Sequence, residues 1–276
     1  GISIRRSDNN GYDTGWSTKF PDQEPNIDGQ LNTMDGLYIP TVTPIDIEAV
    51  DKTSTDVQGA TQKETPTFNT TATNLNGDKI AITPSAEYPA KLVDPVTGRT
   101  TDEPSVTVDG EGTYTINPTT GEVTFTPDPS FTGTAKGVEV TLSAPVGRNK
   151  DGKVQEEYIK TATAKYTPTV TPITVTPTDK VSEDIQNVPQ TQTPTFELSN
   201  DKTAEITSKK LVDPATGQPT DETTVTVAGE GTYTIDPTTG AVTFTPEKDF
   251  VGTATGVTVQ ATATITNANG KTATIT

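Results

Sequence analysis

The chain has 276 residues, of which 60 are Thr and only 29% are hydrophobic, and it contains neither Cys nor His. Without those two residue types it cannot build a Ser-His-Asp or Cys-His triad, and it lacks the usual ligands of zinc, haem and iron–sulfur clusters. Its 20 basic and 37 acidic side chains give a net charge of −17, which disfavours binding to nucleic acids or anionic lipids.

The first segment, residues 1–39, has no counterpart elsewhere in the chain. It contains the single Trp16 together with Phe20 and Tyr38. Its last three residues precede a PTVTP motif in the same way that a similar triplet precedes a second PTVTP further on. We therefore interpret this segment as the C-terminal remnant of an upstream non-repetitive region or of a preceding module.

The remainder of the chain consists of two copies of one module. PTVTPI at 40–45 recurs at 168–173, and EGTYTINPTTGEVTFTP at 111–127 recurs with two changes at 230–246. Length differences between the copies fall in polar stretches, which we interpret as loops. The predicted domains are repeat 1 at 40–167 and repeat 2 at 168–276.

Alternating apolar and polar residues predict strands within each copy. Tyr114 and Ile116 precede the five-residue turn 117–121, and Val123 and Phe125 follow it. The turn begins with Asn-Pro and ends with Gly, which together favour a hairpin. The other strands predicted for repeat 1 are 45–50, 66–70, 79–82, 105–108, 133–143 and 156–167.

Many short strands and no helical periodicity predict an all-β fold: tandem β-sandwich repeat modules joined end to end by short Pro-containing linkers. The linker is the PTVTP segment, 168–172, whose two prolines should make it short and semi-rigid. We expect the natural sequence to continue beyond Thr276 into another such segment. Thin cores predict modest stability for each module and partial unfolding under tension.

Four motifs recur in order in both copies: PTVTP, LVDP-TG, EGTYTI-PTTG-VTFTP and F-GTA-GV. Over about residues 40–276 the chain resembles the CshA-type fibril repeats of Gram-positive wall-anchored surface adhesins. This resemblance implies an extracellular polypeptide that carries an N-terminal adhesive region away from the cell and is attached to peptidoglycan through a C-terminal signal, both outside the present sequence. It implies no catalytic residue.

Paired carboxylates are the one acid–base chemistry that the composition permits. Asp94 with Asp102, and Asp213 with Asp221, are candidate pairs for glycoside hydrolysis. A glycosidase cleft should be rich in aromatic residues, whereas only 5% of this chain is aromatic. We therefore favour turn formation by Asp94 and Asp213, each of which precedes Pro, and expect no enzymatic activity, no catalytic residue and no cofactor-binding residue.

A structural calcium ion is the one cofactor that remains as an alternative, since acidic loops supply its oxygen ligands. Residues 8–13 have suitable residue types without the spacing of an EF-hand loop. The start of each repeat is also acidic, but the two copies differ in arrangement, and we assign no metal ligand. The acidic residues concerned are Asp51, Asp56, Asp179, Glu183 and Asp184.

An isopeptide crosslink through Lys91 or Lys210, which match between the copies, is a further alternative. The sequence identifies neither the buried carboxylate that would catalyse this bond nor the partner side chain. The other interpretation is a solvated lysine at a strand edge, which discourages edge-to-edge pairing.

We expect the repeats to act as a structural stalk, with neighbouring repeats of the same chain as partners and the surface ligand of the parent protein bound outside this fragment. The alternative is that the repeats themselves bind host matrix protein or glycan. No stretch reaches the roughly 18 apolar residues of a membrane helix, so we expect no membrane insertion. The aromatic residues expected in the cores rather than at a binding face are Tyr114, Phe125, Phe131, Tyr233, Phe244 and Phe250.

Overall fold

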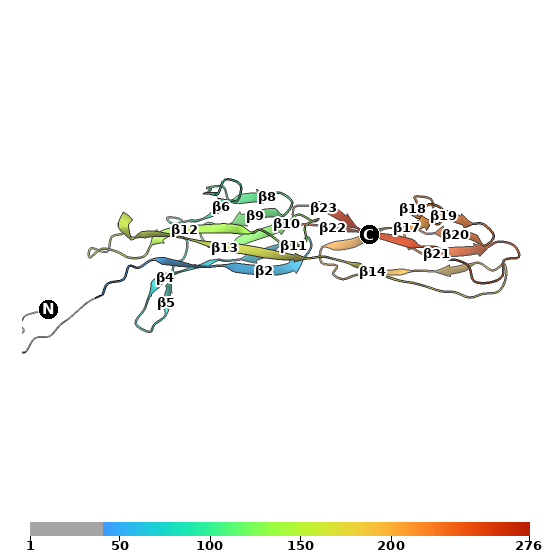
Figure 1. The fold of residues 1–276 in the computed structure, drawn as a ribbon, viewed down its shortest axis with the longest axis horizontal. Coiled ribbons are helices and arrows are strands. Elements are labelled where there is room, and N and C mark those ends of the chain that lie inside the picture. Colours follow the sequence, from blue (N-terminus) through green and yellow to red (C-terminus); the bar gives the residue numbers. More distant parts are fainter. Residues whose placement is uncertain (1–40) are drawn as a thin grey trace, which may run out of the picture. The chain divides into compact units, whose positions relative to one another are not determined.

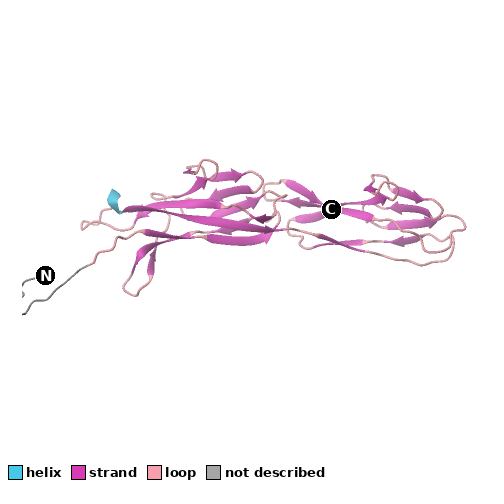
Figure 2. Ribbon diagram, viewed as in Figure 1, coloured by secondary structure: helices cyan, strands magenta, loops and turns pink. Residues whose placement is uncertain are grey.

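The computed structural model describes residues 41–276 (Figure 1). Trp16, Phe20, Tyr38 and the acidic stretch 8–13 therefore lie outside the described residues. Residues 45–276, which contain the strands of both repeats, form one unit. From residue 41 onward every element is a strand except for one short 3-10 helix, Glu156–Tyr158, which confirms the all-β prediction (Figure 2).

Repeat 1 is a sandwich of two main sheets with a smaller sheet beside them. The larger sheet has the order β11-β13-β12-β6-β7, and β2 pairs in parallel with β13. Its strands are β2 (Lys52–Val57), β6 (Ala90–Asp94), β7 (Arg99–Thr100), β11 (Gly133–Thr134), β12 (Val138–Pro145) and β13 (Ile159–Thr171). The opposing sheet contains β3 (Gln62–Glu64), β10 (Val123–Pro127), β9 (Gly112–Ile116) and β8 (Ser105–Val108), and the smaller one β1 (Ile47–Val50), β4 (Thr67–Thr73) and β5 (Lys79–Ala81).

The core of repeat 1 lies between the two main sheets. The predicted hairpin forms, and in it Tyr114 lies opposite Phe125, with their rings stacked at a centroid distance of 4.6 Å. Tyr166 of β13 meets Tyr114 edge-on at 6.3 Å, and Leu92 and Leu142 are fully buried beside them. The alternation of apolar and Thr residues therefore places the apolar face inward, as predicted.

Two of the predicted strands, 133–143 and 156–167, differ from the observed ones. The predicted strand 133–143 is divided into β11 and β12, because Gly137 has a φ of +79° and breaks the ladder. β13 begins at Ile159, after the 3-10 helix, and continues through Thr171, four residues further than predicted. Residues 168–171 of the expected linker therefore belong to the sheet of repeat 1, where they pair with β2. Pro168 fits this strand because it lies where the ladder between β11 and β12 is interrupted, and its carbonyl still accepts the N–H of Ala135 at 3.0 Å.

Repeat 2 has the same sandwich with fewer strands. One sheet has the order β18-β17-β22-β23, the other β15-β21-β20-β19, and β14 pairs with β16. The main sheet comprises β17 (Ala204–Asp213), β18 (Gln218–Pro219), β22 (Val259–Thr266) and β23 (Thr272–Ile275). The remaining strands are β14 (Val175–Thr178), β15 (Gln190–Gln192), β16 (Thr195–Leu198), β19 (Thr224–Val227), β20 (Gly231–Ile235) and β21 (Val242–Pro246).

Candidate functional site

The two repeats contact each other through hydrogen bonds, an ion pair and apolar side chains. This contact begins at the tight turn after β2. The N–H of Ala60 closes this turn on the carbonyl of Val57 at 3.0 Å. Gly59 has a φ of +78°, and a Cβ built on it would lie 2.9 Å from Ile265 Cγ2 of repeat 2. Glycine therefore serves both the turn and the close approach of the neighbouring repeat.

Gln58, in the same turn, is buried and uses every polar group it has. Its N–H donates to the carbonyl of Thr171 at 2.9 Å, and its side-chain amide donates to the carbonyl of Pro129 at 2.8 Å. Its side-chain oxygen accepts the N–H of Ile173 at 3.3 Å, and its carbonyl accepts the hydroxyl of Thr203 at 2.5 Å. One residue thus joins repeat 1 to two segments of repeat 2, through its side chain to Ile173 and through its backbone carbonyl to Thr203.

Asn267 makes a second buried link, from repeat 2 to repeat 1. Its side-chain oxygen accepts the N–H groups of Asn269 and Lys271, which fixes the turn between β22 and β23. Its amide nitrogen then donates to the carbonyl of Pro127 in repeat 1 at 2.8 Å. The turn at 149–153 of repeat 1 is held by Asn149 in the same way.

An ion pair connects the repeats beside these hydrogen bonds, with Lys202 Nζ 2.6 Å from Asp56 Oδ2. Burial alone would raise the pKa of Asp56. Hydrogen bonds from Lys202 and from the N–H of Val57, together with the positive charge of Lys202, outweigh this effect and hold the pKa below its usual value. Asp56 therefore stays ionised in mildly acidic solution and keeps its partner.

Apolar side chains close the junction. One small cluster draws on both repeats, and burial of its members excludes water from the neighbouring hydrogen bonds. The buried members are Ile173, Ala204 and Ile265, with Val57, Leu198 and Ile275 partly buried against them. The arrangement is that of a packed joint between the two repeats.

The candidate catalytic carboxylates have structural partners. Asp94 Oδ1 accepts the N–H of Val96 at 2.7 Å, and Asp213 Oδ1 accepts that of Ala215 at 2.8 Å, so both form the turns expected of Asp-Pro sequences. Asp102 and Asp221 instead pair with lysines at 2.6 Å, and their side chains are about 90% exposed. The hydrogen bond and the charge of Lys210 hold the pKa of Asp221 below its usual value.

Lys91 and Lys210 are the lysines of these two pairs, so the structure joins each isopeptide candidate to an exposed carboxylate. The buried carboxylate of the described residues is Glu111, whose two oxygens both accept the N–H of Lys136. It therefore holds a loop of repeat 1 and is not paired with either lysine.

The acidic residues at the start of repeat 1 are likewise used by the backbone or by the junction. Asp51 accepts the N–H of Lys165 at 2.7 Å, and Asp56 pairs with Lys202. Over residues 41–276 no three acidic side chains gather in a way that could hold a metal ion. Asp179, Glu183 and Asp184 are exposed, and the last two line a groove of repeat 2.

Five of the six aromatic residues predicted for the cores lie there, whereas Phe250 is partly buried and lines the groove of repeat 2. Tyr114 and Phe125 are fully buried, and Phe131 packs against them from a partly buried position. In repeat 2 the Tyr233 and Phe244 rings lie 4.7 Å apart, and Phe250 contacts Phe244 edge-on at 6.1 Å.

The junction residues themselves were not predicted from the sequence. Gln58, Lys202 and Thr203 are ordinary polar residues of loops, and their role depends on contacts across the two copies. Asn267 carried a weak signal, because Asn-x-x-Gly-Lys occurs at 149–153 and again at 267–271 and marks the same turn. Nothing in that pattern indicates the second hydrogen bond that Asn267 makes.

Comparison with known proteins agrees with the internal repeat. A sequence model of one family, described as the surface adhesin CshA repetitive domain, matches residues 44–170 and again 172–276. No curated protein matches the chain. Among solved structures, the crystal structure of the I9–I11 tandem from titin is 14% identical with a TM-score of 0.22, and the match covers 83% of this chain and 64% of that one. No helix between residues 41 and 276 is long and apolar enough to cross a membrane.

Proposed function

Because the chain belongs to the family of surface adhesin CshA repetitive domains, we propose that its two repeats are stalk modules that project a distal N-terminal binding region from the bacterial cell wall. The observation that supports a stalk is the buried junction between the repeats. Bending it would expose or break the hydrogen bonds of Gln58 and Asn267, and a buried polar group left without a partner costs about 1–3 kcal/mol. Such a joint resists folding back.

The proposal includes an extracellular location, attachment to peptidoglycan through a C-terminal signal, and a contribution to virulence through adhesion. It assigns the repeats no catalysis, cofactor or metal ion, and takes neighbouring repeats of the same chain as their direct partners. The Thr-rich, acidic surface suits this role, since a net charge of −17 keeps crowded copies of the chain apart.

Small-angle X-ray scattering on the 276-residue chain tests the stalk. We expect the distance distribution of two modules stacked along their long axes, unchanged between low and physiological salt because the junction depends mainly on buried contacts. A compact particle with the modules folded against each other would contradict the proposal.

The rival function, direct binding of host matrix protein or glycan by the repeats, is tested separately. The aromatic residues of the repeated motif are buried or partly buried and do not form an exposed aromatic face, so we expect no saturable binding of this chain to immobilised matrix proteins or glycan arrays. The parent protein with its N-terminal region is the positive control. Saturable binding by the repeats alone would favour the rival.

A further inference from the structure

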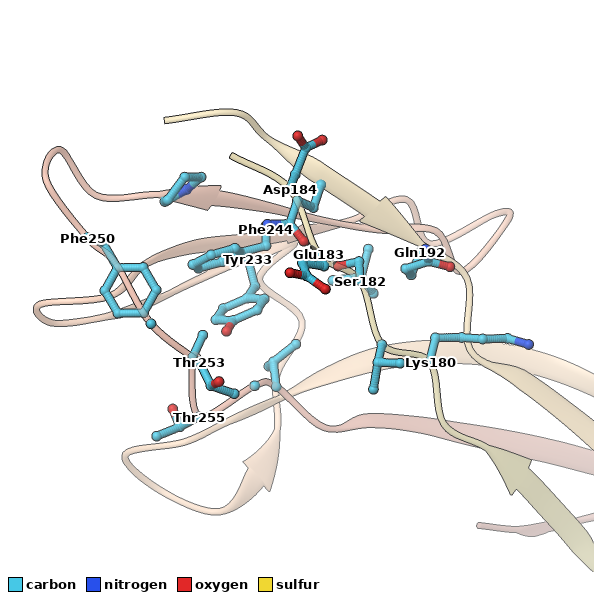
Figure 3. A pocket seen from close by; sticks show the side chains of 18 of the residues that line it. Lys180, Ser182, Glu183, Asp184, Gln192, Tyr233, Phe244, Phe250, Thr253 and Thr255 are labelled. Carbon is cyan, nitrogen blue, oxygen red and sulfur yellow. Dashed lines mark hydrogen bonds between the residues drawn. The ribbon is translucent and has the colours of Figure 1, made fainter. Parts of the chain in front are cut away.

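Repeat 2 contains an open groove of about 840 Å³. Its two walls are the segments 180–186 and 250–257, and both lack strand structure along most of their length. The rings of Tyr233 and Phe244 lie between these walls (Figure 3). Apolar core is thus accessible from one side of the sandwich.

The corresponding space in repeat 1 is filled by the second half of β13, residues 166–171. This stretch pairs in parallel with β2 along one edge and antiparallel with β11 along the other. Its inward side chains, Tyr166 and Val170, are at most 1% exposed. By the repeat alignment, β2 corresponds to 180–185 and β11 to 252–253, which are the walls of the groove in repeat 2.

The groove keeps the polar groups that receive Tyr166 in repeat 1. There, Ser54 donates to the side-chain oxygen of Gln62 at 2.5 Å and also lies 2.7 Å from the hydroxyl of Tyr166. In repeat 2 the equivalent Ser182 donates to the side-chain oxygen of Gln190 at 2.6 Å. No tyrosine hydroxyl joins this second pair in the described part of the chain, so the Ser182 oxygen can still accept a hydrogen bond.

The second wall is also held in the conformation that a strand requires. In repeat 1 the carboxylate of Glu111 accepts the N–H of Lys136 and thereby shapes the loop next to β13. In repeat 2 the carboxylate of Glu230 accepts the N–H of the equivalent Thr255 at 2.9 Å. The loop beside the open groove is therefore preorganised.

Apolar side chains along the two walls are left exposed to solvent. Val181, Ile185 and Val251 are 92%, 75% and 77% exposed, whereas Val57, which corresponds to Ile185, is partly buried in the junction. Exposed β-branched residues beside unpaired backbone groups form a template for one more strand.

The register of β23 points to the origin of that strand. β23 pairs with β22 as the first part of β13 pairs with β12, and Ile275 lies opposite Ala263. Val257 is six residues before Ala263, so the sixth residue beyond Ile275, which is the fifth beyond Thr276, would lie opposite Val257. Tyr166 occupies this position in repeat 1, opposite Val138.

We propose that the groove of repeat 2 accepts one extended strand of the pattern Tyr-x-Pro-x-Val, supplied by chain that continues β23 and running parallel to 180–185. The strand supplies a tyrosine to the Ser182–Gln190 pair and a valine to the apolar floor. A second copy of the chain is disfavoured as donor, because its own Tyr166 and Val170 are buried in its repeat 1. This inference holds equally for a stalk and for a binding module.

The test extends the 276-residue chain by the eleven residues of its own segment 162–172, which places a tyrosine fifth after Thr276. The matched control carries the same extension with Ala in place of its tyrosine and valine. Hydrogen exchange followed by mass spectrometry should show amides in 180–186 and 252–256 protected at least tenfold more in the first protein than in the control. Ser182→Ala in the extended protein should reduce this protection.

Three outcomes would overturn the proposal. The extension could leave exchange in both walls unchanged, or the Ala-substituted extension could protect them equally, which would show that side-chain recognition is absent. The unextended chain could instead show protected walls together with a dimer in sedimentation velocity, and the occupant would then be a second copy.

Discussion

Gly137 lies between β11 and β12, and the backbone conformation that connects these two strands requires a glycine. Its φ is +79°, and a Cβ built on it would lie 2.3 Å from the carbonyl oxygen of Tyr166, a backbone atom that cannot move aside. Gly137→Ala should therefore lower the free energy of unfolding by about 2 kcal/mol or more, through both strain and the clash. Urea denaturation monitored by circular dichroism measures this loss.

Gly98→Ala is the matched control for that substitution. Gly98 has a similar φ of +68°, but nothing lies within 4 Å of its built Cβ. The Gly98→Ala substitution should therefore lower the free energy of unfolding by the conformational strain alone, about 1–2 kcal/mol. Equal losses at Gly98 and Gly137 would contradict the steric role given to the close approach.

Asp56 makes the junction sensitive to acid. Its pKa is lowered in the folded protein, so its contribution to stability is present above the unfolded value of about 3.8 and is lost as the pH falls through the folded pKa. Asp56→Asn should lower the free energy of unfolding by about 0.5–1 kcal/mol at pH 7 and by progressively less below pH 4. Urea titrations between pH 2.5 and 7 measure both effects.

Asp102→Asn is the control for the Asp56 experiment, because it removes an ion pair of the same 2.6 Å length within repeat 1. Its carboxylate is 90% exposed, compared with 28% for Asp56, and solvent screens it. The substitution at Asp102 should have the smaller effect at pH 7. A larger effect there would remove the basis for placing Asp56 in a protected junction.

At the scale of single elements, Asn267 in the β22–β23 turn both stabilises this hairpin and bonds to repeat 1 at the junction. Asn267→Ala removes the turn hydrogen bonds and also leaves the buried carbonyl of Pro127 without its donor. Asn149→Ala removes the equivalent turn bonds of repeat 1, which do not reach another repeat. The Asn267 substitution should therefore cost about 1–2 kcal/mol more than the Asn149 substitution.

Calorimetry of both Asn variants in the full chain supplies this comparison. Hydrogen exchange should in addition show faster exchange in the turn around Gln58 for Asn267→Ala alone, because the water-excluding contact beside it is weakened. Equal stability losses with unchanged exchange at Gln58 would show that the hydrogen bond to Pro127 does not hold the repeats together.

Elements with local partners were predictable from the sequence, and elements with distant partners were not. The hairpin of β9 and β10 was predicted because alternation and an Asn-Pro-x-x-Gly turn indicate it within 16 residues, 112–127. β2 was missed because it has little apolar character and pairs in parallel with a strand far away, as in the contact between Ser54 and Tyr166, which are 112 positions apart.

The same reasoning explains which parts of the candidate sites were foreseen. The turn roles of Asp94 and Asp213 follow from the neighbouring Pro and Gly, so they could be predicted. The pairs of Lys91 with Asp102 and of Lys210 with Asp221 join residues 11 positions apart across a hairpin, which composition alone does not reveal. The junction required the three-dimensional arrangement of both copies.

At the scale of the whole molecule, the two repeats share nearly identical motifs, but the core of repeat 2 lacks side chains that the core of repeat 1 contains. The repeat 1 core includes Tyr166 and Val170 from the second half of β13, which seals one side of the sandwich. The main core of repeat 2 lacks these contributions, and its Phe244 is only partly buried where the equivalent Phe125 is fully buried. Since stability follows apolar burial, repeat 2 should be the weaker module.

We expect this difference to separate two unfolding transitions of the full chain, with repeat 2 unfolding first in urea. Leu92 and Leu211 occupy equivalent, fully buried positions of the two repeats, so substitution of each by Ala should cost about 2–5 kcal/mol. Leu211→Ala should shift the earlier transition and Leu92→Ala mainly the later one, with the transitions assigned by pulsed hydrogen exchange. If both variants shifted one common transition, the junction would couple the repeats into a single cooperative unit. Under tension, the repeats of such a stalk would then unfold together, and the weakest repeat would not unfold first.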